Sequence, residues 1–287
     1  MTTATTAVEE AALPPSTPDP QDECVLCCYP FPLKLAGSVY HECCGEVICW
    51  GCIIAQKRTL IIGTNVMKPI AGSKGEELEF KKILSSKNSM VCPFCRTKVP
   101  RNSKEHLKRL WERIDEYNDP KAMNKMGVDY MQGNHGLSKN LKKAEELFQR
   151  SYDLDNPSAA NNLFVLHRDH VPDEARMIPY AEEGARRGEL TCMHALAKRA
   201  AQSGNLEEAV QHLMMAACSG HDLAMQNLMK FYGNKLLSKE DLAATLRAHK
   251  AANDAGKSEP REYAQRYYKF QKKKIVELRG NRSLVAE

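Results

Sequence analysis

Cysteine spacing is the feature that most restricts how this chain can fold. Nine of its eleven cysteines lie between Cys24 and Cys95. Six of the nine form C-x2-C pairs, namely Cys24/Cys27, Cys49/Cys52 and Cys92/Cys95. A C-x2-C pair supplies two thiolates from one tight turn, and structural zinc is held by four nitrogen or sulfur ligands. The spacing therefore predicts a zinc-binding module rather than a set of unrelated thiols.

The six cysteines in these pairs do not fill a whole number of four-ligand zinc sites. Six are too many for one ion and two fewer than two ions require. The segment between the first two pairs offers His41, Cys43, Cys44 and Glu46 as the missing ligands. We expect Cys43 and Cys44 to complete the second of two zinc sites, since Gly45 permits a sharp turn there. His41 together with Cys44 is the first alternate. Glu46 is the second, because carboxylate is the rarer ligand in structural sites.

The rest of the composition indicates a reducing compartment. Residues 1–22 lack the basic region and apolar core of a secretory signal. They are rich in Thr, Ala and Pro, which predicts a disordered tail. No apolar run approaches the roughly 20 residues of a membrane helix. We therefore expect a cytoplasmic or nuclear protein with reduced cysteines and no membrane partner.

A residue pattern typical of helices begins after the last cysteine pair. Residues 101–118 predict a linker helix capped by Ser103, and proline after Asp119 is typical of a new helix start. The chain then repeats itself. Counted from Ala144 and again from Ala209, similar residue types recur at offsets of 4, 7, 8, 11, 12 and 15. Helical pairs that recur in this way stack into a solenoid.

Two further copies of the repeat are less regular. One runs from Gly184 through Gly188 to Cys192, and a weaker one runs from Ala252 to Pro260. In each copy a small residue stands where two helices must approach closely, and a Gly or Asn is expected to end a helix in the left-handed conformation. Cys192 and Cys218 fall on these helices, where we expect packed and unreactive thiols.

Residues 261–287 form a basic C-terminal helix and tail in this interpretation. We expect Tyr263, Tyr267 and Phe270 to cap the open end of the solenoid, as terminal repeats require. The Lys272–Lys274 run would suit nucleic acid, but a charge run is usually a solvated helix face. The net charge of +5 is also small. Nucleic acid is therefore the weakest of the partners that we consider.

The repeats resemble the Sel-one-like family, relatives of the tetratricopeptide repeat. The match is clearest from Ala122 to Ala144, including the loop glycines Gly133 and Gly136. In the second copy, Asn162-Leu163-Phe164 stands where that family has Leu-Gly. The resemblance implies an all-α helical-repeat solenoid over residues 119–260. Its concave face would recruit a protein substrate.

The order of the cysteines resembles the RING finger, whose two zinc ions are bound crosswise. The resemblance implies one ion on Cys24, Cys27, Cys49 and Cys52, and another on Cys92, Cys95 and the uncertain pair. It also implies a small α+β module over residues 23–100. A RING usually has histidine where Glu46 stands, and the present form resembles predicted algal RING proteins that also carry helical repeats.

The RING resemblance also predicts what surrounds the zinc ligands. It implies a short helix from Cys52 to Leu60, and an insertion over about 61–90. We expect residues 71–90 of that insertion to be flexible, because residues 72–88 are mostly polar.

The RING resemblance implies function by positioning, with no catalytic residue on this chain. A ubiquitin-conjugating enzyme loaded with ubiquitin would contact Leu26, Pro93 and Phe94, and Arg96 would bond both partners. We therefore expect a RING-type ubiquitin ligase or ligase adaptor. The alternatives are a non-catalytic interaction scaffold and a nucleic-acid-binding zinc protein. Histidines of the repeats, such as His135 and His194, are expected to be structural.

Overall fold

The computed structural model describes residues 23–31, 38–64, 66–86 and 91–283, and the expected tail over residues 1–22 lies outside them. A two-stranded sheet and two helices come first: β1 (Ser38–His41), β2 (Glu46–Cys49), α1 (Trp50–Ile62) and α2 (Lys74–Ser85). The linker helix α3 (Ser103–Tyr117) follows. The remaining helices are α4 (Pro120–Gln132), the short 3-10 helix η2 (Asn134–Gly136), α5 (Leu141–Asp153), α6 (Pro157–Asp169), α7 (Glu174–Arg186), α8 (Leu190–Gln202), α9 (Leu206–Cys218), α10 (Asp222–Gly233), α11 (Lys239–Ala255) and α12 (Glu259–Ser283).

The N-terminal module, which is the described part of the chain before α3, has a very small apolar core around its cysteines. Strands β1 and β2 pair antiparallel, with Ser38 opposite Cys49 and His41 opposite Glu46. Ile48 and Ile53 are buried, but their buried neighbours are the cysteines Cys24, Cys49 and Cys92. So little apolar surface cannot offset the conformational entropy that folding removes. The module needs a cross-link of another kind.

The second part of the chain is a helical repeat. Within the described residues, helices α4 to α11 pack as four consecutive pairs. The second helices of the pairs begin at Leu141, Glu174, Leu206 and Lys239, at intervals of 33, 32 and 33 residues. The small residues Ala144, Ala159, Ala209 and Ala224 are fully buried where helices meet. The expected helical repeat is therefore confirmed, and its second copy packs like the others.

Several helix ends depart from the sequence interpretation by one residue. Asn102, rather than Ser103, caps α3, and its side chain accepts a hydrogen bond from the Glu105 N–H. Asp155 adopts the left-handed conformation at the end of α5, while Asn156 caps α6. Gly188 and Gly220 are left-handed as expected. Asparagine suits both tasks, so sequence alone does not separate them.

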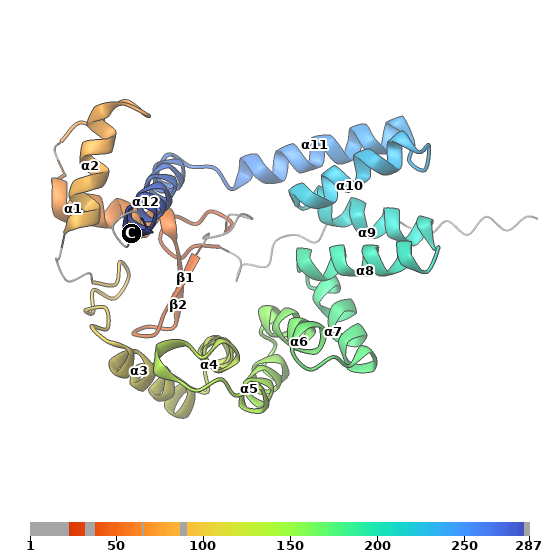
Figure 1. The fold of residues 1–287 in the computed structure, drawn as a ribbon, viewed down its shortest axis with the longest axis horizontal. Helices are drawn as coiled ribbons and strands as arrows, with labels where there is room; N and C mark the ends of the chain where they lie inside the picture. The colour runs from red at the N-terminus through yellow and green to blue at the C-terminus, as the bar shows by residue number, and fades with distance from the viewer. Residues whose placement is uncertain (1–22, 32–37, 65, 87–90, 284–287) are drawn as a thin grey trace, which may run out of the picture.

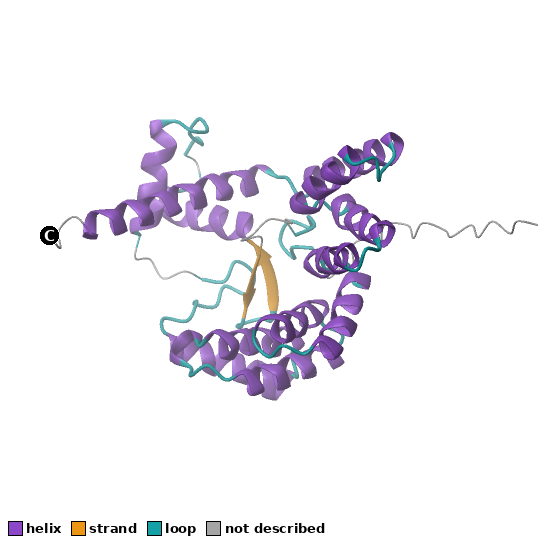
Figure 2. Ribbon diagram, turned by 45° about the vertical axis from the view of Figure 1, so that its right-hand side comes forward, coloured by secondary structure: helices purple, strands orange, loops and turns teal. Residues whose placement is uncertain are grey.

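The helices follow an arc around the small sheet. Figure 1 shows α3 to α11 curving from one side of the N-terminal module toward the other, and Figure 2 shows the two strands lying inside the curve. Helix α12 leaves the end of the arc and returns to α1 and α2 (Figure 1). The C-terminal helix α12 thus packs against the helices of the N-terminal module.

The C-terminal helix corrects one expectation. Tyr263 and Tyr267 are buried, but they pack with Ile54, Phe80 and Ile83 of the N-terminal module and do not cap the repeats. The rings of Phe80 and Tyr263 lie 5.2 Å apart in an edge-to-face contact. An amphipathic pattern predicts that a face is buried, but it does not identify the partner.

The insertion corrects a second expectation. Residues 71–90 were expected to be flexible, yet α2 covers Lys74–Ser85. Ser73 caps this helix, and its side chain accepts a hydrogen bond from the Glu76 N–H. Phe80 and Ile83 are buried against α12, which gives the helix a tertiary partner. Residues 87–90 lie outside the described part of the chain.

The close contact between α4 and α5 predicts how a methyl group added at Gly127 changes the stability of the protein. A Cβ atom on Gly127 would lie 2.6 Å from Cε1 of the buried Phe148. We expect Gly127→Ala to lower the free energy of unfolding by about 1–3 kcal/mol through overpacking. Urea denaturation followed by circular dichroism measures the change.

Gly233→Ala is the matched control, because a Cβ on Gly233 would meet nothing within 4 Å. It should leave stability unchanged or raise it by up to about 1 kcal/mol. Equal stability of the two variants would contradict the close packing of α4 and α5.

Candidate metal centres

With Cys43/Cys44 counted as a second pair, the chain has four cysteine pairs in order, and the first group of thiols joins the first pair, Cys24/Cys27, to the third, Cys49/Cys52. Cys24 Sγ lies 3.9 Å from Cys52 Sγ, and Cys27 Sγ lies 3.8 Å from Cys49 Sγ. The four sulfur atoms lie within 4.8 Å of one another. Tetrahedral zinc with Zn–S bonds of about 2.3 Å sets neighbouring sulfurs roughly 3.8 Å apart. The spacing of this group therefore fits a zinc ion.

The second group joins the adjacent cysteines to the last pair. Cys44 Sγ lies 3.8 Å from Cys92 Sγ, and Cys43 Sγ lies 3.3 Å from Cys95 Sγ. Both adjacent cysteines reach the group because the chain turns sharply after β1. Gly45 has φ of 77°, and its N–H donates to the His41 carbonyl at 2.9 Å. The eight thiols thus form two groups of four, each able to hold a metal ion.

The other candidate ligands lie outside both groups. His41 and Glu46 face each other across the strand pair, and neither belongs to a four-thiol cluster. His41 is 8% exposed, and burial lowers the pKa of its imidazole. Cys28 is exposed and also lies outside the groups, as expected of a free neighbour. The donor set in each group is therefore four sulfurs.

Two of the C-x2-C pairs sit on matching turns. In the first turn, the Cys28 N–H donates to the Cys24 carbonyl at 2.8 Å, and the Cys24 N–H donates to the Tyr29 carbonyl at 3.0 Å. In the second turn, the Arg96 N–H donates to the Cys92 carbonyl at 3.0 Å, and the Cys92 N–H donates to the Thr97 carbonyl at 2.7 Å. Cys28 and Arg96 both have positive φ, of 53° and 61°. One turn geometry is therefore used twice, once in each thiol group.

The expected contact residues lie on these turns. Leu26 is 39% exposed and Phe94 is 48% exposed, although both are large and apolar. They occupy the same place, two residues after the first cysteine of each turn. Pro93 is half-buried and Arg96 is exposed. The turns therefore direct apolar side chains to the surface, while their thiols point into the groups.

The thiols of the first group differ in pKa. A hydrogen bond with Cys49 lowers the pKa of Cys24 to about 4, whereas burial raises the pKa of Cys52 to about 12. Zinc binds thiolates, so an ion displaces the protons that remain. A bound zinc ion would act here as a structural cross-link between the two cysteine pairs.

Arg261 of α12 lies against the first thiol group. It is 3% exposed, and its guanidinium donates to the Tyr29 carbonyl at 3.0 Å and to the Pro30 carbonyl. One of its nitrogens lies 3.5 Å from Cys27 Sγ. Four thiolates around one Zn²⁺ carry a net charge of −2, which a neighbouring guanidinium partly offsets. The C-terminal helix therefore contributes to the electrostatics of an N-terminal site.

Gly51 permits this close approach. A Cβ atom there would lie 2.7 Å from Arg261 Cγ and 3.0 Å from its backbone nitrogen. Glycine in the first turn of α1 thus lets α12 pack directly on the helix that carries Cys52. The sequence signal was available, since a glycine between the two cysteines of the third pair marks a close backbone approach.

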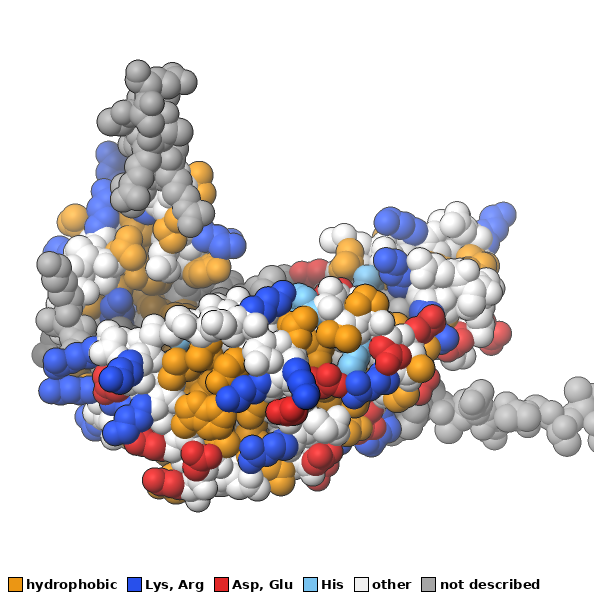
Figure 3. All heavy atoms as spheres, turned by 60° about the horizontal axis from the view of Figure 1, so that its bottom comes forward, with side chains coloured by type: hydrophobic (Ala, Val, Ile, Leu, Met, Phe, Trp, Pro, Cys, Tyr) orange, Lys and Arg blue, Asp and Glu red, His pale blue; other side chains and the backbone are white. Residues whose placement is uncertain are grey.

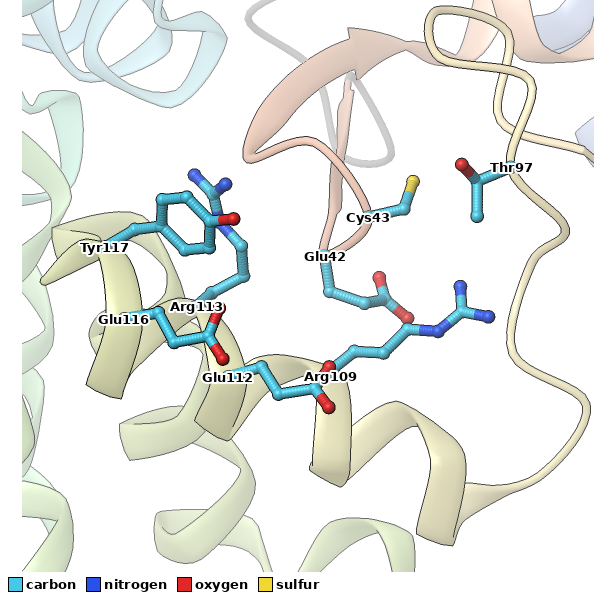
Figure 4. Close-up of a pocket in the computed structure, with 8 residues that line it drawn as sticks. All are labelled: Glu42, Cys43, Thr97, Arg109, Glu112, Arg113, Glu116 and Tyr117. Atoms are coloured by element: carbon cyan, nitrogen blue, oxygen red, sulfur yellow. The ribbon is translucent and has the colours of Figure 1, made fainter.

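The second thiol group is the more open of the two. A surface pocket of about 280 Å³ is lined by Cys43, Thr97 and α3. Figure 4 shows the charged side chains of α3 that line it, with Cys43 and Thr97 beyond them. Arg113 donates to Asp119 at 2.7 Å, and Arg109 donates to the Lys98 carbonyl at 2.7 Å. Cys95 is itself exposed, so water reaches this group more easily.

A histidine at the start of the arc joins the module to the repeats. His106 of α3 has Nδ1 3.0 Å from Glu42 Oε1 and Nε2 3.5 Å from Asp129 Oδ2. These carboxylates, Asp129 first, raise the pKa of His106 to about 9. The His135 ring lies 4.2 Å away. Sequence reasoning missed this cluster, because only the packing of α3 on α4 brings its members together.

Comparison with known proteins gave only distant likenesses. No protein-family model matches the chain, and no curated protein matches it. Among solved structures, a Sel1 repeat protein from Oxalobacter formigenes is similar at a TM-score of 0.41 and 16% identity, over 60% of this chain and 78% of that one. A protective antigen of uropathogenic Escherichia coli with an SLR fold is similar at a TM-score of 0.39 and 13% identity, over 75% of this chain and 52% of that one. An immunity protein from Pseudomonas aeruginosa is similar at a TM-score of 0.30 and 14% identity, over 68% of this chain and 86% of that one.

These TM-scores are low, and the evidence for a helical repeat is the regular spacing of the helix pairs described above. In the part of the chain that the structure describes, no helix has both the length and the apolar character needed to cross a membrane.

The difference in exposure predicts the order in which the thiol groups lose metal. During chelation with EDTA, N-ethylmaleimide should label Cys43, Cys44, Cys92 and Cys95 before Cys24, Cys27, Cys49 and Cys52. Peptide mass spectrometry over time measures the order. The exposed Cys28 should react at once without chelator, and the buried Cys192 only on unfolding. Earlier labelling of the first group would contradict the prediction.

The contacts of Arg261 predict a long-range effect on the first group. Arg261→Gln removes a buried charge that bonds backbone carbonyls, so we expect a loss of about 3 kcal/mol in unfolding free energy. Zinc release from the first group to a chelating dye should also become faster.

Arg266→Gln is the matched control for Arg261. Arg266 lies on the same helix and bonds Glu76 of α2 at 3.0 Å, away from the thiols. It should leave zinc release unchanged, whatever stability is lost with the Glu76 ion pair. If both variants release zinc equally fast, the guanidinium has no specific role at the first group.

Proposed function

We propose that this protein is a RING-type ubiquitin ligase or ligase adaptor that holds two zinc ions. The observation that carries the proposal is the crossed grouping of the cysteine pairs. The first and third pairs share one group, and the second and fourth share the other. This interleaving ties both halves of the module together and supports the resemblance seen in the order of the cysteines.

The surface next to the thiol groups supports a docking role. Leu26 and Phe94 are exposed on turns that the thiol groups hold in place. Val25 and Tyr29 on the first turn are also exposed, at 40% and 45%. Large exposed apolar side chains on rigid turns are the kind of anchor that protein interfaces use. We propose that this face contacts the ubiquitin-conjugating enzyme.

The proposed mechanism is positioning rather than covalent catalysis. The ubiquitin thioester stays on the conjugating enzyme, and the module restrains it in a reactive orientation. Arg96 follows the last zinc-binding cysteine and is exposed, so its guanidinium is available to donate to both bound partners. Loss of one such contact reduces the rate without abolishing binding of the metal.

The repeats supply the substrate side of the proposal. Figure 3 shows apolar side chains gathered beside Lys, Arg, Asp and Glu over one outer face of the arc. Lys143 of α5 lies over the rings of Trp111 of α3 at 5.2 Å and Tyr130 of α4 at 4.8 Å. Mixed apolar and charged surface is typical of non-obligate protein interfaces. We propose that the repeats recruit a protein substrate on this outer face. The small sheet lies inside the curve (Figure 2), on the side of the concave face that the family resemblance implied.

A reconstituted ubiquitination assay tests the proposal. Zinc-loaded full-length protein, incubated with a panel of conjugating enzymes, should stimulate discharge of ubiquitin from the thioester. Leu26→Ala and Arg96→Ala should each reduce discharge at least tenfold, because interface anchors contribute more than about 1.4 kcal/mol. Gel analysis of thioester decay gives the rates.

Leu78→Ala is the control, since Leu78 is 55% exposed on α2 and lies outside the proposed contact face. All variants should keep two cysteine-bound zinc ions and the helical circular dichroism signal. Absence of discharge with every conjugating enzyme would favour the alternative, a zinc-bound scaffold whose repeats only bind proteins.

A further inference from the structure

Three metal-ligand side chains meet where the repeats begin. His106 comes from α3, Asp129 from α4, and His135 from the short helix η2 that follows α4. One ligand atom from each lies within 4.8 Å of the others. This cluster is separate from the thiol groups, and it uses nitrogen and oxygen rather than sulfur.

Two atoms that face each other in this cluster lie at ion-pair distance but make no hydrogen bond. Asp129 is fully buried, and its Oδ2 has no hydrogen-bond partner within the described residues. The same holds for Nε2 of His106, which lies 3.5 Å from that oxygen. Zinc bonds of about 2.1 Å to nitrogen and oxygen in a tetrahedron set the two ligand atoms roughly 3.4 Å apart. The separation is thus that of two atoms sharing one ion.

Neighbouring groups fix the ligands in binding orientations. Glu42 Oε1 lies 3.0 Å from Nδ1 of His106, so this nitrogen donates and Nε2 is the one left for an ion. A carboxylate behind a metal-binding histidine is a common supporting contact. On Asp129, Oδ1 accepts from Lys125 at 2.8 Å and from Asn134 at 3.3 Å, and Nε2 of His135 lies 3.8 Å from this oxygen. Oδ2 makes no hydrogen bond and faces His106.

We propose that His106, Asp129 and His135 form a third metal site, for a divalent transition-metal ion such as zinc. Two imidazoles and one carboxylate are a ligand set that zinc accepts, and magnesium and calcium prefer oxygen. His135 is exposed, so the fourth position faces solvent.

The local charge is compatible with a cation. The carboxylates of Glu42 and Asp129 face His106, and the ammonium of Lys125 is bound to Asp129. With neutral imidazoles, these three groups sum to one negative charge, which a divalent ion more than balances. The ion joins α3 to α4, and through Glu42 it reaches the segment that precedes Cys43. It therefore fastens the module to the first repeat.

Zinc counting on the full-length protein tests this site independently of any ligase activity. The protein is equilibrated by dialysis against micromolar free zinc and analysed by elemental mass spectrometry. An organomercurial then displaces thiolate-bound zinc, which a chelating dye measures. We expect one zinc ion per chain to resist the mercurial. Asp129→Asn and His135→Ala should each remove that ion, or weaken its binding at least tenfold.

His194→Ala is the matched control. The His194 ring lies 5.6 Å from that of His221 on other repeat helices, in a histidine pair outside every candidate metal cluster of the described chain. This variant should keep the mercurial-resistant ion. His135→Ala changes an exposed loop residue, so it should fold even if Asp129→Asn does not. Absence of a resistant ion in the unchanged protein, or its persistence in His135→Ala, overturns the proposal.

Discussion

The crossing of the cysteine pairs is the constraint on which the rest of the structure depends. Around its thiols the module buries few apolar side chains, Ile48 and Ile53 among them, whereas Ile54, Phe80 and Ile83 pack against α12. Structural zinc contributes about 10–16 kcal/mol of apparent binding free energy in small peptides, more than such a core can supply. Because the pairs interleave along the chain, neither group can open without loosening the segment that carries the other.

Closure of the chain by α12 adds a second constraint. Arg261 and Cys27 are 234 positions apart, yet their side chains touch. A flexible loop of that length would oppose the contact entropically, but the intervening repeats are folded and fix the distance. Docking of α12 is therefore preorganised by the curvature of the solenoid. A change in the packing of a distant repeat should alter the position of Arg261 and hence the first thiol group.

How much the sequence predicts depends on how local the signal is. Ligand spacing within a few residues predicted a zinc-binding module, and the RING resemblance predicted how its cysteines divide into two groups. Residue types that recur at the same offsets from Ala144 and Ala209 predicted the helix pairs. Helix α2 was missed because its buried face contains two glutamates. Glu79 is paired with Arg58 at 2.6 Å, and Glu76 with Arg266 at 3.0 Å. Buried ion pairs look like solvated charge in a sequence, so the segment was interpreted as flexible. The docking partner of α12 and the His106 cluster depend on tertiary packing alone.

The two attachments of the module have consequences for any partner that it binds. At one end, Tyr40 donates to Asp119 at 2.8 Å, and Arg113 bonds the same carboxylate, so β1 is fixed to the start of the repeats. At the other end, α12 fixes α1. A module held at both ends of an arc cannot swing as a domain on a flexible linker does. The face with Leu26 and Phe94 therefore keeps a set orientation toward the repeats. If the module binds a conjugating enzyme and the repeats bind a substrate, as proposed, the two partners would be held at a fixed distance, and a substrate too short to span that distance would not be modified.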